Sequence, residues 1–162
     1  MFFDKVYVSM IFDTNQDKVK IFGCDDVDIG GIGSIFPTKT LDKEIDDMIP
    51  YYFEYENTSY GYVTRGCIRN CYFCKVPKFE GLIRFYCPIE KIILHHNLIL
   101  YDNNILAWNG HKDLFRYLIE HKIRVRFKAG LDFRLTDSEN LELLSKLNYD
   151  GSYEFAFDHI SY

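Results

Sequence analysis

The spacing of hydrophobic residues from residue 60 onward changes repeatedly between a strand pattern and a helix pattern. Apolar residues at every second position are typical of strands, whereas apolar residues three or four positions apart are typical of helices. The strands predicted in this way are residues 60–65, 98–101, 123–129 and 153–157. The helices predicted between them are residues 88–95, residues 111–122 and a third segment that begins near Thr136. Strands and helices are therefore expected to alternate through this part of the chain.

The third predicted helix has a recognisable start and one apolar face. Thr136 and Glu139 have the spacing of a capping box, in which the two side chains hydrogen-bond the backbone at the helix start. Leu141, Leu144 and Leu147 follow at intervals of three residues. We expect these three leucines to face the core.

Repeated strand–helix units over residues 60–162 predict an α/β fold with a parallel sheet and right-handed crossovers. The loops that leave the carboxyl ends of the strands then lie along one edge of the sheet, where parallel sheets bind ligands. Four polar segments are expected at this edge: a cysteine-rich loop after residue 65, residues 102–104, residues 130–134 and Asp158. The series stops after its fourth strand, too early for a closed barrel. Either the sheet is open, the chain pairs with another chain, or the sequence is a fragment.

Residues 1–59 have a different pattern and are predicted to form a small N-terminal α/β extension. Residues 6–12 and 19–22 are apolar enough for two strands, and residues 40–49 have helical spacing. The glycines between residues 28 and 33 lack the full dinucleotide fingerprint and the lysine of a phosphate-binding loop. We therefore interpret them as a tight surface turn.

Composition and charge narrow the class of protein. Hydrophobic residues make up 48% of the 162 residues and aromatic residues 17%, which is too many for a disordered chain. The formal net charge of −5 disfavours a surface that binds nucleic acid by charge alone. Residues 65–84 are an exception, since Glu80 is the single acid among several basic residues: Arg65, Arg69, Lys75, Lys78 and Arg84. This basic island suits an anionic cluster and cofactor better than a polynucleotide.

The cysteine content and the apolar runs bear on location. The chain has five cysteines, an odd number, and three of them lie too close together for a framework of disulfides. No apolar run is long enough to span a membrane, and no signal segment opens the chain. A protein of the reducing cytoplasm that is not integral to a membrane is therefore expected.

Three cysteines, Cys67, Cys71 and Cys74, lie within eight residues directly after a predicted strand. Three thiolates on one loop can hold three irons of a cubane cluster, and the missing fourth protein ligand leaves one iron open to a substrate or cofactor. The alternative is a structural zinc site with Cys87 or His95 as the fourth ligand. Zinc ligands generally come as two short-spaced pairs, and the sequence contains no second pair. The spacing therefore favours an iron–sulfur cluster.

The run from Gly66 to Cys74 resembles the cluster motif of the radical S-adenosylmethionine (radical SAM) superfamily, C-x3-C-x2-C with an aromatic residue before the last cysteine. Residues 62–66, 76–81 and 130–135 are similar to segments of the subgroup that often carries an N-terminal cobalamin-binding-like domain. The resemblance implies an incomplete parallel (βα) barrel and a [4Fe–4S] cluster on the three cysteines. It also implies that S-adenosylmethionine chelates the fourth iron and that its reductive cleavage gives a 5′-deoxyadenosyl radical.

The resemblance further implies residues that bind S-adenosylmethionine. Phe73 matches the aromatic residue that packs on the adenine. Asp102, Asn103 and Asn104 occupy the position of a Gly-Gly-Glu segment that meets the methionyl amine, and which of them does so is open. Candidates for the ribose, the carboxylate or the substrate project from strand ends: Asp132, Arg134 and Asp158. A plainer interpretation is that both aspartates cap the next helices and that Arg134 pairs with one of them.

The partners and the reaction are less defined. Relatives that bind cobalamin share an Asp-x-His-x-x-Gly motif, and no histidine precedes His95, which argues against cobalamin. Residues 1–59 are then expected to be a remnant of the cobalamin-binding-like domain. An electron donor such as flavodoxin or ferredoxin is implied, whereas the substrate is not defined by the sequence. The alternative function is a non-catalytic iron–sulfur or zinc-binding module derived from a truncated radical SAM barrel.

Overall fold

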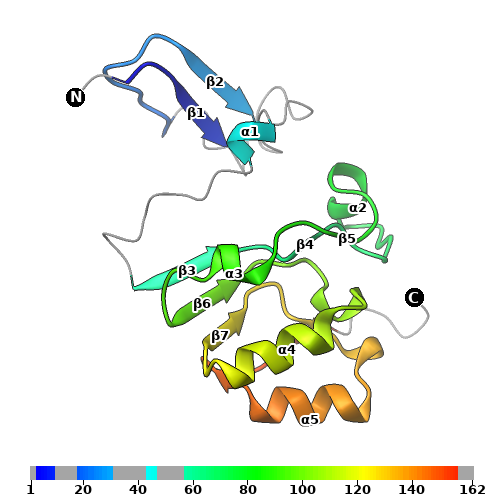
Figure 1. Ribbon diagram of the computed structural model, residues 1–162. Coiled ribbons are helices and arrows are strands. Elements are labelled where there is room, and N and C mark those ends of the chain that lie inside the picture. The colour runs from blue at the N-terminus through cyan, green and yellow to red at the C-terminus, as the bar shows by residue number, and fades with distance from the viewer. Residues whose placement is uncertain (1–2, 10–17, 31–42, 47–56, 157–162) are drawn as a thin grey trace. The chain divides into compact units, whose positions relative to one another are not determined.

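A computed structural model describes residues 3–9, 18–30, 43–46 and 57–156 of the chain (Figure 1). The chain divides into two compact units, Met1–Met48 and Ile49–Tyr162. The boundary predicted after residue 59 therefore falls inside the second unit. In the described ranges, no helix is both long enough and apolar enough to cross a lipid bilayer.

The first unit contains two parallel strands. β1 (Val6–Ser9) pairs with β2 (Val27–Gly30), and Val6 lies opposite Val27. The second strand is expected at residues 19–22, but those residues are irregular, and β2 forms where a surface turn is expected. Both predictions are wrong because a parallel partner must follow a crossover connection, which a short polar turn cannot provide.

The helix of the first unit is α1 (Lys43–Asp46), which lies within the predicted helix at residues 40–49. The remainder of that helix lies outside the described residues. The same holds for residues 10–12 of the first predicted strand and residues 31–33 of the glycine cluster.

The second unit is built on a sheet of four parallel strands. In spatial order these are β3 (Thr58–Gly61), β6 (Asn97–Leu100), β7 (Arg124–Phe127) and β9 (Asn148–Tyr149). All three neighbouring pairs are parallel, so the described residues form a mixed α/β unit with a parallel sheet, while the incomplete barrel stays a prediction. The spatial order follows the chain without reversal, as around a (βα) barrel and unlike a doubly wound sheet. The described residues form an open sheet and no closed barrel.

An α-helix directly precedes each of β6, β7 and β9 in the chain: α3 (Ile89–Ile92), α4 (His111–Glu120) and α5 (Ser138–Lys146). Figure 1 shows α4 and α5 side by side, and the two helices pack against each other. The core between helices and sheet is formed by almost completely buried side chains, among them Leu98, Leu100, Val125, Phe115 and Leu118. The helix predicted at residues 111–122 is present and two residues shorter than expected, whereas the one predicted at residues 88–95 is reduced to the four residues of α3.

The start of α5 differs from the predicted capping box. Asp137, not Thr136, is the N-cap, and its carboxylate accepts a hydrogen bond from the Asn140 backbone N–H at 2.7 Å. The Glu139 carboxylate does not return to the helix start, because it binds the Lys112 ammonium on α4 at 2.7 Å. A cross-helix ion pair has replaced the local contact that the motif predicts.

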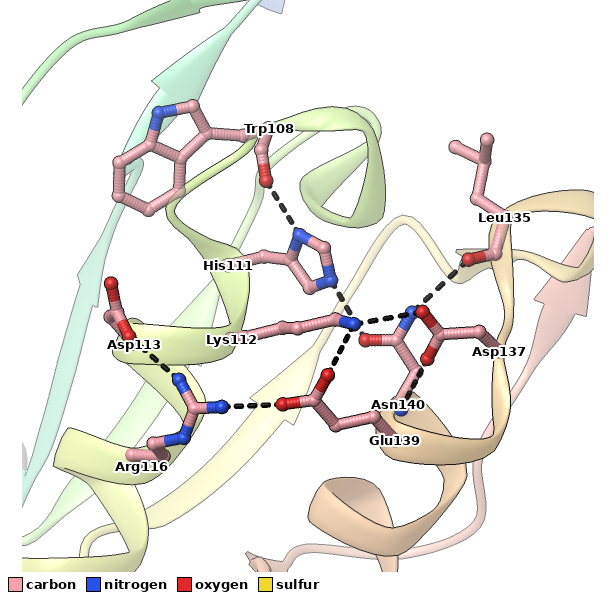
Figure 2. A network of polar contacts seen from close by, with 9 residues as sticks. All are labelled: Trp108, His111, Lys112, Asp113, Arg116, Leu135, Asp137, Glu139 and Asn140. Carbon is pink, nitrogen blue, oxygen red and sulfur yellow. Dashed lines mark hydrogen bonds and ion pairs between the residues drawn. The ribbon is translucent and has the colours of Figure 1, made fainter.

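The buried face of α5 also differs from the prediction, since Leu141 is 53% exposed. The buried residues are spaced by three and four positions, which places them on one face of the helix: Asn140, Leu143, Leu144 and Leu147. Figure 2 shows why an asparagine is buried there. Its Oδ1 lies 2.7 Å from His111 Nε2, and its Nδ2 donates to the Leu135 carbonyl at 3.1 Å.

The strand predicted at residues 153–157 is present only in part and joins a different ladder. β10 (Phe155–Ala156) pairs in parallel with β8 (Leu131–Asp132), outside the four-stranded sheet. The fourth position in the main sheet is taken by β9, which the hydrophobic pattern does not predict. Tyr153 stacks on Tyr149 of β9 with ring centroids 3.8 Å apart. Its side chain therefore packs against a neighbouring ring, although Tyr153 itself does not belong to a strand.

Candidate metal centre

The three cysteines lie on a hairpin that follows the carboxyl end of β3. After β3 the chain turns, and β4 (Thr64–Arg65) pairs with β5 (Arg84–Phe85) in an antiparallel ladder. The strand expected at residues 60–65 is therefore divided in two. We call residues 66–81 the cysteine loop; it includes the short helix α2 (Val76–Phe79), which begins just after Cys74.

A glycine is needed where the cysteine loop begins. Gly66 has a φ of +86°, a conformation that L side chains rarely adopt. A Cβ at this position would lie 2.3 Å from the Leu82 carbonyl oxygen. The next residue, Cys67, donates its backbone N–H to the Gly81 carbonyl at 3.1 Å. The two ends of the loop therefore meet, with all three cysteines between them.

Cys67 is held by hydrogen bonds, and none of the five cysteines forms a disulfide. The Cys67 Sγ accepts from the Arg69 backbone N–H at 3.3 Å and from Asn104 Nδ2 at 3.6 Å. Cys74 donates its N–H to the Cys71 carbonyl at 2.9 Å, which forms a turn. Among the described residues, no three His, Cys, Asp or Glu side chains are grouped closely enough to hold a metal ion. Joint binding therefore requires the turn to move Cys71 and Cys74 toward Cys67.

The donor set fits an iron–sulfur cluster better than a closed zinc site. Three cysteine thiols on one loop are the ligand type that such clusters take. His95 precedes β6, at the opposite edge of the sheet, where its backbone N–H donates to Ser59 Oγ at 2.8 Å. Cys87 packs against the hydrophobic core. Neither proposed fourth zinc ligand is therefore grouped with the loop thiols.

Asp102 connects the end of β6 to β4. Its carboxylate accepts hydrogen bonds from Thr64 Oγ1 at 2.6 Å, from the Thr64 backbone N–H at 2.5 Å and from the Val63 N–H at 3.2 Å. Burial raises the pKa of the Asp102 carboxyl, and the hydrogen bonds from Thr64 and Val63 oppose that rise only in part. Asp102 therefore holds β4, which leads into the cysteine loop, to the end of β6.

The two asparagines that follow β6 both reach the cysteine loop. Asn103 Nδ2 donates to Glu80 Oε2 at 2.8 Å. Asn104 Nδ2 lies between Cys67 Sγ and Asp132 Oδ2, the second at 3.3 Å. The Asn104 Oδ1 is buried and has no hydrogen-bond partner. An unpaired buried acceptor costs roughly 1–3 kcal/mol, so this oxygen is suited to a ligand that donates a hydrogen bond.

Asp132 binds two arginines at the end of β8. Its Oδ2 accepts from Arg69 Nε at 2.8 Å and its Oδ1 from Arg134 Nε at 2.7 Å, while the carboxylate is only 5% exposed. Burial raises the pKa of the Asp132 carboxyl, but the hydrogen bonds from Arg134 and Arg69 lower it by more, so the net shift is downward. Arg69 lies between Cys67 and Cys71, and Asp132 therefore fastens the cysteine loop to the segment after β7.

The plainer interpretation of Asp132 and Arg134 agrees with these contacts. The Asp132 carboxylate also accepts the Arg134 backbone N–H at 3.3 Å, which caps the short 3-10 helix Phe133–Leu135. Both residues thus have structural partners. Asp158, the remaining candidate at a strand end, lies outside the described residues.

Phe73 lies at the outer corner of the cysteine loop. Its ring is 57% exposed and meets the ring of Tyr72 edge to face, with centroids 5.2 Å apart. Because the ring is exposed, it is accessible to a planar ligand.

The residues that the sequence does not identify are those that hold the cysteine loop in place. Thr64, Arg69 and Glu80 each bind a residue from another segment. Glu80 carries one visible signal, since it is the single acid in the basic island. Three of the four segments expected at the carboxyl edge do meet there: the cysteine loop, residues 102–104 and residues 130–134.

Comparison of the chain with protein-family models, with curated proteins and with solved structures found no match. Any assignment of function therefore depends on the cysteine spacing and on the geometry of this edge of the sheet.

Proposed function

We propose that this chain is a radical SAM enzyme in which Cys67, Cys71 and Cys74 hold a [4Fe–4S] cluster. The observation that carries the proposal is the C-x3-C-x2-C loop, which is attached to the carboxyl edge of a parallel α/β sheet. When bound, the cluster and S-adenosylmethionine supply a 5′-deoxyadenosyl radical, which abstracts a hydrogen atom from a substrate. The strand order supports an incomplete (βα) barrel as the scaffold.

The contacts narrow which side chains bind S-adenosylmethionine in this proposal. Asp102 and the Asn103 amide nitrogen already have partners within the protein. The buried, unpaired Oδ1 of Asn104 makes it the best acceptor for an N–H of the methionyl amine. Phe73 has an accessible ring for the adenine. Asp132 and Arg134 are better suited to positioning the cysteine loop than to binding the ribose.

The proposal includes a redox partner and a compartment. An acidic electron donor such as flavodoxin or ferredoxin complements the exposed basic residues of the cysteine loop, Lys75 and Lys78. Five cysteines without a disulfide fit the reducing cytoplasm. Cobalamin is not part of the proposal, because the histidine of its binding motif is missing from the N-terminal residues.

Product analysis tests the proposed function. The full chain is reconstituted with iron and sulfide without oxygen, and dithionite and S-adenosylmethionine are then added. We expect 5′-deoxyadenosine only when the cluster, the reductant and S-adenosylmethionine are all present. Chromatography with mass detection measures the product, and omission of dithionite is the control.

Failure of this experiment has a specific meaning. A chain that carries a [4Fe–4S] cluster but forms no 5′-deoxyadenosine contradicts the proposal and leaves the non-catalytic iron–sulfur module. A chain that binds zinc in preference to the cluster leaves the zinc-binding module.

A further inference from the structure

Glu80 binds three residues from two segments of the chain that are distant from it in sequence. Its Oε2 accepts the Gly66 backbone N–H at 2.9 Å and Asn103 Nδ2 at 2.8 Å, and its Oε1 lies 3.1 Å from Arg65 Nη2. Gly66 begins the cysteine loop, Arg65 belongs to β4, and Asn103 follows β6. One carboxylate at the end of the loop therefore binds its start and the edge of the sheet.

We infer that Glu80 is a positioning residue that keeps the cysteine loop closed before any metal arrives. That Glu80 closes the loop does not depend on the proposed function. Only the purpose of the closed loop, which is to bind a cluster, rests on it. Closing a flexible segment costs conformational entropy, and a loop whose two ends are already joined meets part of that cost before its thiols come together around a metal. With Gly66 held to Glu80, the three cysteines stay within one closed loop of the chain.

A carboxylate is the group that this position requires. All three neighbours of Glu80 are hydrogen-bond donors, and an ionised carboxylate is purely an acceptor. The Arg65 guanidinium is itself held by cation–π contacts, 4.3 Å from the Tyr62 ring centroid and 5.7 Å from that of Tyr86. Hydrogen bonds to an ionised group are roughly twice as strong as neutral ones. The Glu80 side chain is 21% exposed, so solvent weakens these contacts only in part.

The contacts of Glu80 are separate from the hydrophobic core. The core is formed by buried side chains of the main sheet, of α3, α4 and α5 and of the segments that follow β6 and β7, together with Val63. None of the three residues that bind the Glu80 carboxylate, Arg65, Gly66 and Asn103, belongs to this core. Loss of the carboxylate is therefore expected to open the loop locally while the sheet remains folded.

Hydrogen exchange of the full chain without metal tests the inference. The probe is the Cys67 amide, which donates to the Gly81 carbonyl and does not contact Glu80 directly. In Glu80→Ala we expect this amide to exchange roughly tenfold faster, the equivalent of one charge-assisted hydrogen bond. Glu80→Gln should give an intermediate rate, because it retains one acceptor oxygen but loses the Arg65 ion pair. Glu90→Ala, on the exposed surface of α3, is the matched control.

The amide of Val125 in the central strand β7 reports whether the sheet stays folded. Faster exchange at Cys67 with unchanged exchange at Val125 supports the inference. Equal Cys67 exchange in Glu80→Ala and Glu90→Ala overturns it, and so does faster exchange at both amides. Iron content after reconstitution is measured separately. A wild-type chain that takes up no iron refutes the proposed function, while the exchange rates still decide the role of Glu80.

Discussion

Replacement of Cys71 with alanine is expected to abolish cluster binding, the largest effect of any single substitution in this chain. A cubane cluster with one open iron needs three protein thiolates, and two cannot hold it against loss of iron. Cys71 also lies on the turn that must move toward Cys67, so no other thiol of the loop can take its place. Iron content, acid-labile sulfide and the brown colour should all disappear after anaerobic reconstitution, together with formation of 5′-deoxyadenosine.

Cys87→Ala is the matched control for this substitution. Cys87 is partly buried against the hydrophobic core, and its Sγ contacts the Pro88 carbonyl at 3.6 Å. We expect this variant to retain full iron and sulfide content. Loss of metal in Cys87→Ala, or full iron content in Cys71→Ala, contradicts the ligand assignment; the first result indicates a four-cysteine site.

Asp132→Ala is expected to lower the free energy of unfolding by about 3 kcal/mol, because removing one partner of a buried ion pair leaves the other charges uncompensated. Two guanidiniums, of Arg69 and Arg134, then lose the carboxylate that both of them bind. The loss detaches the cysteine loop from the segment after β7, so iron occupancy should fall as well. Denaturant unfolding followed by circular dichroism measures the first effect.

The pH dependence of the unfolding free energy of Asp132→Ala tests whether loss of the ion pairs causes the destabilisation. Because the folded-state pKa of Asp132 lies below its ordinary value, its stabilising effect is present above a pH of about 3.9 and is lost as the pH falls through the folded-state pKa. The gap between wild type and Asp132→Ala should therefore narrow in acid. Asp113→Ala, which removes an exposed ion pair with Arg116 on α4, should change stability little at any pH. A gap that is the same at all pH values contradicts the ion-pair explanation.

The hydrophobic pattern predicts the longer elements of the fold well. In α4, Leu114, Phe115 and Leu118 recur at helical spacing and are all buried. In β7, Val125 and Phe127 alternate with arginines as expected. In both elements the apolar spacing repeats often enough for the period, and therefore the buried face, to be recognised.

Short elements and competing contacts explain the errors. β4, β5, β8, β9 and β10 each have only two residues, too few to show any period. The start of α5 is shifted because Glu139 binds Lys112 and because Asn140 is buried beside His111. Such contacts depend on how two helices pack, which a pattern within one helix does not contain.

The residues of the candidate site likewise fall into those that the sequence predicts and those whose role only the folded chain reveals. The three cysteines are visible in the sequence because their C-x3-C-x2-C spacing is itself the motif on which the proposed function rests. The tasks of Asp102, Asp132 and Glu80 depend on partners in other segments of the chain, which become neighbours only at the carboxyl edge of the sheet. Residue type predicts that these side chains lie near the site, and only the folded chain shows that they hold it together.

The central claim is that three cysteines hold a [4Fe–4S] cluster and leave one iron open. Mössbauer spectroscopy of the chain reconstituted with ⁵⁷Fe, before and after addition of S-adenosylmethionine, tests it most directly. We predict that the signal of one of the four irons changes on addition, while the other three keep the parameters of thiolate-bound sites. A spectrum that S-adenosylmethionine leaves unchanged, or a chain that retains zinc and no iron, contradicts the claim.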